Sequence, residues 1–282
     1  MADHPDSRQR ELGLQLGLGA ALSGIRGYGA AEIEQVYVRA VALARQVGDV
    51  SKHADALFGL GLWSLVRGRI RATHEWAVQL SSLQSSDAGL FAARAQYLFS
   101  AATFFRGRSQ EAWQMLQPEG AGGAAEPPPG SAPSRVRIDA SHWKLGSAHG
   151  LWVCGHAERA MEQIDVGLEA ATALKNTRWM ASALNSAALL HQLNRSYPAS
   201  LACAGVLHEL AEKNDDLVHF EALAAMFRAQ ALVEAGQLLE GLEALEDARP
   251  RPGPCCPSQC RQLRGLSRST RGLQNHHCRS SN

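Results

Sequence analysis

The chain has 282 residues, 45% of them hydrophobic and 20% charged, with a net charge of +1. All 27 acidic residues lie at or before Asp247, whereas seven of the 28 basic residues follow it. The residues up to Asp247 therefore hold 21 basic and 27 acidic side chains, a net charge of −6, which argues against a nucleic-acid groove there.

The first residues, MADHPDSRQREL, are polar and charged where a secretory signal needs a basic start and an apolar centre. We expect residues 1–10 to be disordered. The most apolar window, residues 89–105, is interrupted by Arg94 and Gln96 and falls short of the roughly 18 residues of an uninterrupted membrane span. These features predict a soluble, cytoplasmic protein.

Residues 11–116 show three helical hairpins in succession. The clearest, Ala56 to Leu83, has an apolar helical pattern, a turn at Gly68 and a second helical pattern. The hairpin before it ends at Gly48, a typical C-terminal cap, and the one after it turns at Gly107. Because one hairpin cannot bury its own apolar face, the pattern favours a stacked array whose role is binding.

Residues 117–134 interrupt the array. The segment contains Pro127, Pro128 and Pro129 and several glycines, a composition that cannot continue a helix. We predict a loop. A flexible insertion without function and a proline-rich ligand for a partner are both compatible with it.

Residues 135–248 contain three further hairpins, with turns predicted at Gly155, Asn194 and Gly236. Gly68 and Gly107 lie 39 residues apart, as do Gly155 and Asn194. We expect Asn194 to adopt the left-handed conformation that glycine adopts in the other turns. Small residues stand seven before and five after each turn, at Gly61, Ser100, Ala148, Ala187 and Ala229 and at Thr73, Ala112, Ala160, Ala199 and Gly241. Small side chains there let the paired helices approach closely.

This repeat resembles the tetratricopeptide repeat, with a longer period. The segments ELGLQLGLGAALSGIRGYGAAEIEQVYVRAVALARQVGD and LFGLGLWSLVRGRIRATHEWAVQL resemble the C-terminal repeat region of bacterial adenylate or guanylate cyclase and signal-transduction ATPase regulatory proteins, over roughly Glu11 to Asp247. The chain departs from that pattern because it has no GxxxxGK[ST] motif and because the Pro/Gly loop divides its repeats. The fold class predicted is an all-α solenoid of about six hairpins with a disordered C-terminal tail.

Residues 249–282 form that tail, which has no acidic residue and no helical pattern. Its composition is also what GC-rich DNA encodes in a shifted frame, so we hypothesise a frameshift, which resequencing across the codon for Arg249 would test. The possible metal ligands of the tail are Cys255, Cys256, Cys260, His276, His277 and Cys278. Without apolar residues to fold around an ion, they predict no zinc site.

No catalytic, cofactor or metal site is predicted elsewhere. His142 and His149 lie seven residues apart, about 10.5 Å along one helix, which is too far to share a metal ion. Cys154 and Cys203 are predicted to be buried thiols. A helical enzyme would need titratable residues converging on one pocket, and the sequence shows no such group, so the chain is predicted not to be an enzyme.

The resemblance implies a binding groove, because the first helix of each tetratricopeptide hairpin lines the concave face through positions 2, 5, 9 and 12. Counted back from the turns, these positions are Arg94, Tyr97, Ala101 and Phe104, then His142, Leu145, His149 and Trp152, then Ala181, Leu184, Ala188 and His191. Their aromatic and histidine side chains suit a protein, a peptide or a small ligand. The alternative is that Phe104, Leu145 and Trp152 belong to the core between helices.

These patterns predict a non-catalytic regulatory module that binds a protein or a ligand. The resemblance implies that it is a fragment of a bacterial multidomain signalling protein whose ATPase and cyclase or other effector domains lie outside this chain. A free-standing adaptor for the assembly of protein complexes is the alternative.

Overall fold

The computed structural model describes residues 5–84, 88–116 and 148–247, and every regular element in these ranges is helical. The first block consists of α1 (Pro5–Arg26), α2 (Ala31–Val47), α3 (Val50–Val66), α4 (Ile70–Ser81), α5 (Ala88–Phe104) and α6 (Ser109–Met115). The second block consists of the helical residues 148–153, α8 (Ala157–Leu174), α9 (Thr177–Leu193), α10 (Tyr197–Glu212), η1 (Asp215–Leu217), α11 (Val218–Glu234) and α12 (Leu238–Asp247).

Within each block, each labelled helix packs against the next one along the chain. The first helices of neighbouring hairpins also contact each other, as in the pair α3 and α5 and the pair α9 and α11. This is the contact pattern of stacked helical hairpins. The predicted all-α solenoid is therefore confirmed.

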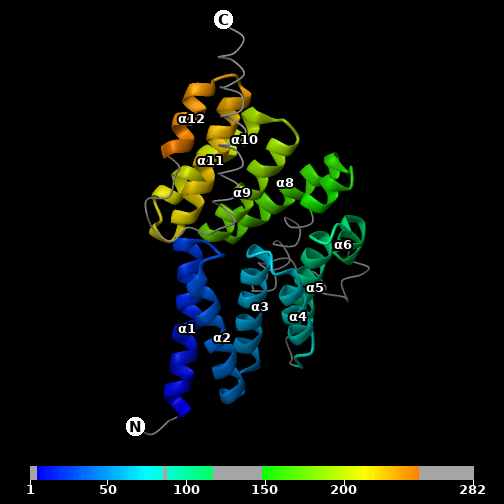
Figure 1. The fold of residues 1–282 in the computed structure, drawn as a ribbon, viewed down its shortest axis with the longest axis vertical. Coiled ribbons are helices and arrows are strands. Elements are labelled where there is room, and N and C mark those ends of the chain that lie inside the picture. Colours follow the sequence, from blue (N-terminus) through cyan, green and yellow to red (C-terminus); the bar gives the residue numbers. More distant parts are fainter. Residues whose placement is uncertain (1–4, 85–87, 117–147, 248–282) are drawn as a thin grey trace, which may run out of the picture.

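The two blocks meet at their ends. Figure 1 shows α1 to α6 standing side by side below and α8 to α12 above them. The C-terminal half of α1 contacts both η1 and α11, which belong to the last hairpins. The first hairpin therefore contacts the last ones.

The turns between paired helices use one backbone conformation. Its left-handed residue is a glycine in four hairpins, with φ between 72° and 86°: Gly68, Gly107, Gly155 and Gly236. The prediction that Asn194 occupies this position was wrong, since Asn194 has φ −85° and Arg195 has φ 57°. The amide of Ser196 donates to the His191 carbonyl at 2.8 Å, the same bond that closes the turn at Gly68. The fifth turn is thus displaced by one residue.

The displaced register explains the small residues of the fifth hairpin. Counted from Arg195, they are Ala188 and Ser200, and the Ser200 hydroxyl donates to the Ala188 carbonyl at 2.9 Å. In the third hairpin the Ser100 hydroxyl donates to the Ala112 carbonyl at 2.7 Å. Larger residues at these positions would keep the paired helices apart, so the predicted packing reason holds in the corrected register.

Helix α1 begins at Pro5, so the expectation that residues 1–10 are disordered was wrong for the residues from Pro5 onward. Proline suits the first helical position because it lacks the amide hydrogen that would be unpaired there. The side chain of Gln9 donates to Asp49 at 3.3 Å, and Leu12 is fully buried, so this first part of the helix is held by the next hairpin. The predicted loop at residues 117–134 and the tail at 249–282 lie outside the described residues.

Candidate functional site

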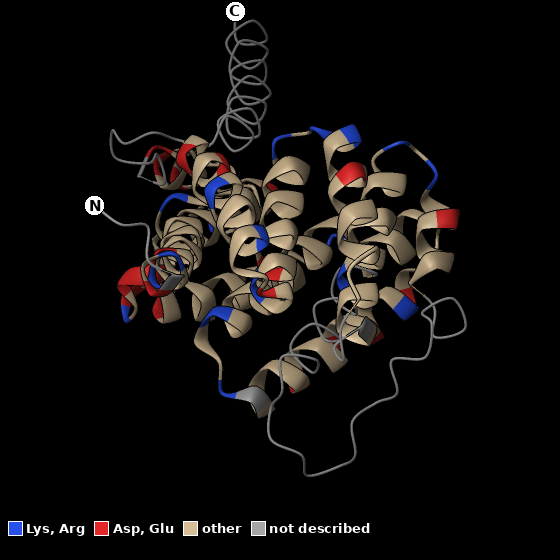
Figure 2. Ribbon diagram, turned by 90° about the horizontal axis from the view of Figure 1, so that it is seen from below, with Lys and Arg blue, Asp and Glu red and all other residues tan. Residues whose placement is uncertain are grey.

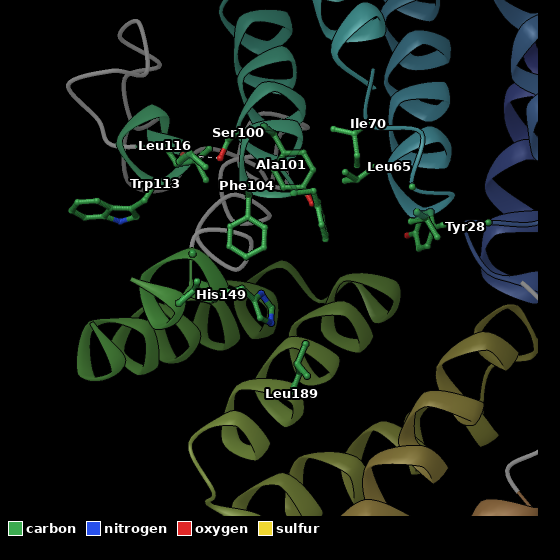
Figure 3. A pocket seen from close by; sticks show the side chains of 18 of the residues that line it. Tyr28, Leu65, Ile70, Ser100, Ala101, Phe104, Trp113, Leu116, His149 and Leu189 are labelled. Atoms are coloured by element: carbon green, nitrogen blue, oxygen red, sulfur yellow. Dashed lines mark hydrogen bonds between the residues drawn. The ribbon is translucent and has the colours of Figure 1, made fainter. Parts of the chain in front are cut away.

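A cavity of about 710 Å³ lies where the two blocks meet. The first block lines it with the α1–α2 turn, the ends of α3 and α4, and one face of α5 and α6; the second block lines it with residues 149–153, α9 and α11. Figure 3 shows α5 side chains pointing from one side toward His149 and Leu189 on the other. Its volume falls in the range of small-molecule sites in proteins.

Helix α5 supplies the first wall of the cavity. Tyr97, Ala101 and Phe104 recur at intervals of four and three residues, so they share one helix face. The hydrogen bond from Ser100 to α6 holds Trp113 and Leu116 beside that face. Phe104 is half-buried and directed into the space between the blocks (Figure 3).

The second wall consists of His149 and Val153 on the helix before α8, Leu189 and Leu193 on α9, and Leu223 on α11. Leu189 and Leu193 lie one turn apart and present a continuous apolar strip to the cavity. Figure 3 places His149 opposite Phe104, with Leu189 farther along the same wall. The wall is therefore aliphatic, with one imidazole at the Phe104 end.

The far end of the cavity is where the blocks touch. The Tyr28 ring lies edge to face with His219, with centroids 6.4 Å apart. Arg178 of α9 donates to the Ala20 carbonyl at 3.1 Å and pairs with Asp216 at 3.1 Å. Close approach requires glycine here, because a Cβ at residue 24 would lie 2.2 Å from the Asp216 carbonyl oxygen.

Burial favours the neutral form of three side chains that line the cavity, His219, Tyr28 and Tyr97. Burial lowers the pKa of His219 to about 4. Burial also raises the pKa of the Tyr28 and Tyr97 hydroxyls, with nearby Arg178 acting in the opposite direction on Tyr28. The described lining contains no Lys, Arg, Asp or Glu, although acidic and basic residues are interspersed over the described helices (Figure 2).

Four predicted groove residues, Tyr97, Ala101, Phe104 and His149, line this cavity. Arg94 does not: it is 7% exposed, pairs with Asp55 at 2.8 Å and lies over the Phe58 ring. It therefore ties α5 to α3.

Trp152 also lies outside the described lining. Its indole donates to Asn194 at 3.4 Å, and it packs against the core of the second block, as the alternative interpretation expected. The predicted residues of α9 occupy the wrong face: Ala181, Leu184 and Ala188 are buried in the core and His191 is outside the lining. Counting from Arg195 shifts the four positions to Ser182, Asn185, Leu189 and Gln192, and of these Leu189 lines the cavity, so the one-residue error accounts for that position alone. His142 and Leu145 lie outside the described residues.

Tyr28, Leu65, Trp113 and His219 line the cavity and were not predicted. Tyr28 lies in the turn between α1 and α2 and His219 lies near the start of α11, so residue spacing within one repeat cannot relate them. They come together because the two blocks meet, and no local pattern encodes that contact.

In the part of the chain that the structure describes, no group of three or more His, Cys, Asp or Glu side chains could hold a metal ion. Cys154 and Cys203 are free thiols and only partly buried, and burial raises the pKa of Cys203. Among the described helices, none is long and apolar enough to cross a membrane.

No protein-family model and no curated protein matches the sequence. Among solved structures, the apo form of RapI matches at 14% identity with a TM-score of 0.43, over 88% of this chain and 66% of the RapI chain. A likeness of that degree adds nothing to what the residues of this chain show. The resemblance to the repeat region of cyclase and ATPase regulatory proteins stays a prediction.

Proposed function

We propose that the chain is a non-catalytic regulatory module of the helical-repeat type, which responds to a ligand or to the apolar side chains of a peptide bound between its two blocks. The observation that carries this proposal is a cavity to which both blocks contribute walls. An occupant contacts both blocks at once, so it binds the closed arrangement more tightly than any arrangement in which the blocks separate.

The described contacts between the blocks are both apolar and polar, since Trp113 of α6 packs against the core of the second block and its ring lies 5.8 Å from that of His156. They include the bond from Arg178 to Ala20, its ion pair with Asp216 and the ring contact between Tyr28 and His219. Partly exposed ion pairs stabilise a contact by about 1 kcal/mol or less. An apolar occupant of the cavity would add the burial of its own surface to the free energy that favours closure.

In this proposal the module acts in the bacterial cytoplasm, and the output passes to an attached effector or an associated protein. The resemblance of the repeats to those of cyclase and ATPase regulatory proteins supports this setting. The chemistry of the output lies outside the described residues.

Amide hydrogen exchange in the presence of 1-pyrenemethanol, an uncharged apolar probe, tests the coupling. At ten times the Kd, we expect exchange to slow about tenfold at residues 27–30 of the first block and at residues 215–217 of the second. The Ala101→Trp variant fills the cavity from α5 and should lose the effect. The matched control, Ala92→Trp, places the same side chain on the exposed face of α5 and should keep it. Protection in one block alone contradicts the proposal.

A further inference from the structure

The described lining of the cavity between the two blocks contains no Lys, Arg, Asp or Glu side chain, and this defines the class of ligand. We propose that the cavity selects an uncharged small molecule with a flat, largely apolar body and one hydrogen-bonding group. This inference rests on the proposed function, because it names the ligand class of the same site.

The flat body follows from the aromatic walls. Tyr97, Phe104 and Trp113 come from the first block, and His149 faces Phe104 from the second (Figure 3). Ring systems prefer stacked or edge-to-face contact with such side chains. Leu189 and Leu193 complete the opposite surface.

A single hydrogen-bonding group follows from the polar end. Tyr28 and His219 are the polar side chains there, and both are neutral near pH 7 for the reasons given above. The hydroxyl of Ser100 is already donated to the Ala112 carbonyl. We expect one hydroxyl or carbonyl of the ligand to lie at this end of the cavity.

The small number of hydrogen-bonding side chains in the described lining also argues against a peptide segment as the occupant of the cavity. Each residue of a peptide brings a backbone N–H and a C=O that need partners once removed from water. The described lining consists mainly of leucine, valine, alanine, glycine and phenylalanine residues, whose side chains form no hydrogen bonds. A compact ring system fills the volume without leaving such groups unpaired.

Anionic ligands are disfavoured because the arginines near the cavity either pair with other groups of the protein or lie outside the cavity. Arg178, at the Tyr28 end, is engaged by Asp216 and by the Ala20 carbonyl. Arg159 lies 5.3 Å from the centre of the Trp113 ring and is exposed to solvent. An anion in the cavity would lose its hydration without gaining a cationic partner.

The test compares three probes of one shape: 1-pyrenemethanol, 1-pyrenecarboxylate and 1-pyrenemethylammonium. Binding is followed by pyrene fluorescence, whose band ratio reports the polarity around the ring. We expect the alcohol to bind with an apolar band ratio and both ions to bind at least about tenfold more weakly.

Two variants locate the binding. Ala101→Trp fills the cavity from the first block, and Leu189→Trp fills it from the second; either should weaken binding of the alcohol by about tenfold or more. Ala92→Trp on α5 should bind like the parent protein. The second filling variant keeps the test decisive if the first does not fold.

Equal binding of all three probes overturns the ligand class while leaving a binding site at the junction. Tighter binding of the carboxylate, lost in Arg159→Gln, also overturns it and assigns the charge to that arginine. Failure of every probe to bind overturns the proposed function as well. Unchanged binding in both filling variants places the site elsewhere and overturns the inference.

Discussion

The two blocks bury their cores by different means. The first block has a large cluster across α1 to α5 and a small one of Ala30, Ile33 and Trp63. The large cluster is filled by large side chains that are fully buried or nearly so: Leu12, Leu43, Leu57, Leu60, Leu80, Phe91 and Leu98. The second block has three smaller clusters, which together hold nine larger side chains and ten alanines: Ala148, Ala160, Ala171, Ala183, Ala187, Ala181, Ala188, Ala204, Ala211 and Ala224.

Close approach of paired helices occurs in both blocks, since the Ser100 hydroxyl reaches the backbone of α6 and the Ser200 hydroxyl reaches that of α9. The blocks differ in what fills the remaining core. A large buried side chain leaves a cavity when it is truncated, whereas a buried alanine leaves little room for a larger residue. The first block should therefore be sensitive to lost volume, and the second to added volume.

The largest effect is expected from Leu60→Ala in the first block. Leu60 is 1% exposed and central to the cluster, so its truncation should lower the free energy of unfolding by about 2–5 kcal/mol. Urea denaturation measures the change. Val38→Ala, at a side chain that is 49% exposed on α2, should cost less than about 0.5 kcal/mol. Equal losses at the two sites would contradict a core built on large side chains.

The contact between the blocks should depend on pH through His219. Its pKa is about 4 in the folded protein against an ordinary value of 6.5, because burial disfavours the imidazolium. The unfolded state therefore binds more protons between these values, and stability falls as the pH drops from about 6.5 to about 4, by up to about 3 kcal/mol. His219→Leu should flatten that dependence in urea titrations. An unchanged slope in the variant would mean that His219 is not buried at the contact.

The second block is probed by adding volume. Ala187 is fully buried on α9, so Ala187→Leu should destabilise the protein by about 1–3 kcal/mol through overpacking. Ala202→Leu, on the exposed face of α10, is the matched control and should be within about 0.5 kcal/mol of the parent. Thermal unfolding compares the two. A tolerated leucine at Ala187 would show that the second block has room to spare.

The smallest changes in stability are expected from substitutions at the left-handed turn residues, and their signs should differ between the two blocks. Arg195 has φ 57°, a region that a non-glycine residue occupies at a cost, so Arg195→Gly should stabilise the chain by about 0.5–1 kcal/mol. Gly68→Ala, at φ 72° in the first block, should destabilise it by about 1 kcal/mol. A loss of stability in Arg195→Gly would show that the arginine side chain contributes more than its backbone costs.

Sequence patterns are sufficient to predict the hairpins, because the small residue, the turn glycine and the helical apolar pattern are all local. They identify the face of α5 that bears Tyr97 and Phe104. They fail at Arg195, because Ala187, Ala188, Ala199 and Ser200 are all small and fit either register.

The meeting of the two blocks could not be predicted from repeat spacing. The contact joins Ala20 to Arg178 and Gly27 to His219, residues that lie in different hairpins far apart in the chain. The cavity depends on that contact, so the sequence predicted only four of its lining residues, Tyr97, Ala101 and Phe104 on α5 and His149 on the helix before α8.

The central claim is that both blocks build one ligand site, and a crystal structure of the full chain with 1-pyrenemethanol tests it most directly. We predict that the pyrene ring lies between Phe104 and Leu189, with its hydroxyl directed toward Tyr28 and His219. A ring bound elsewhere, or two blocks apart with no contact between α1 and α11, would contradict the claim.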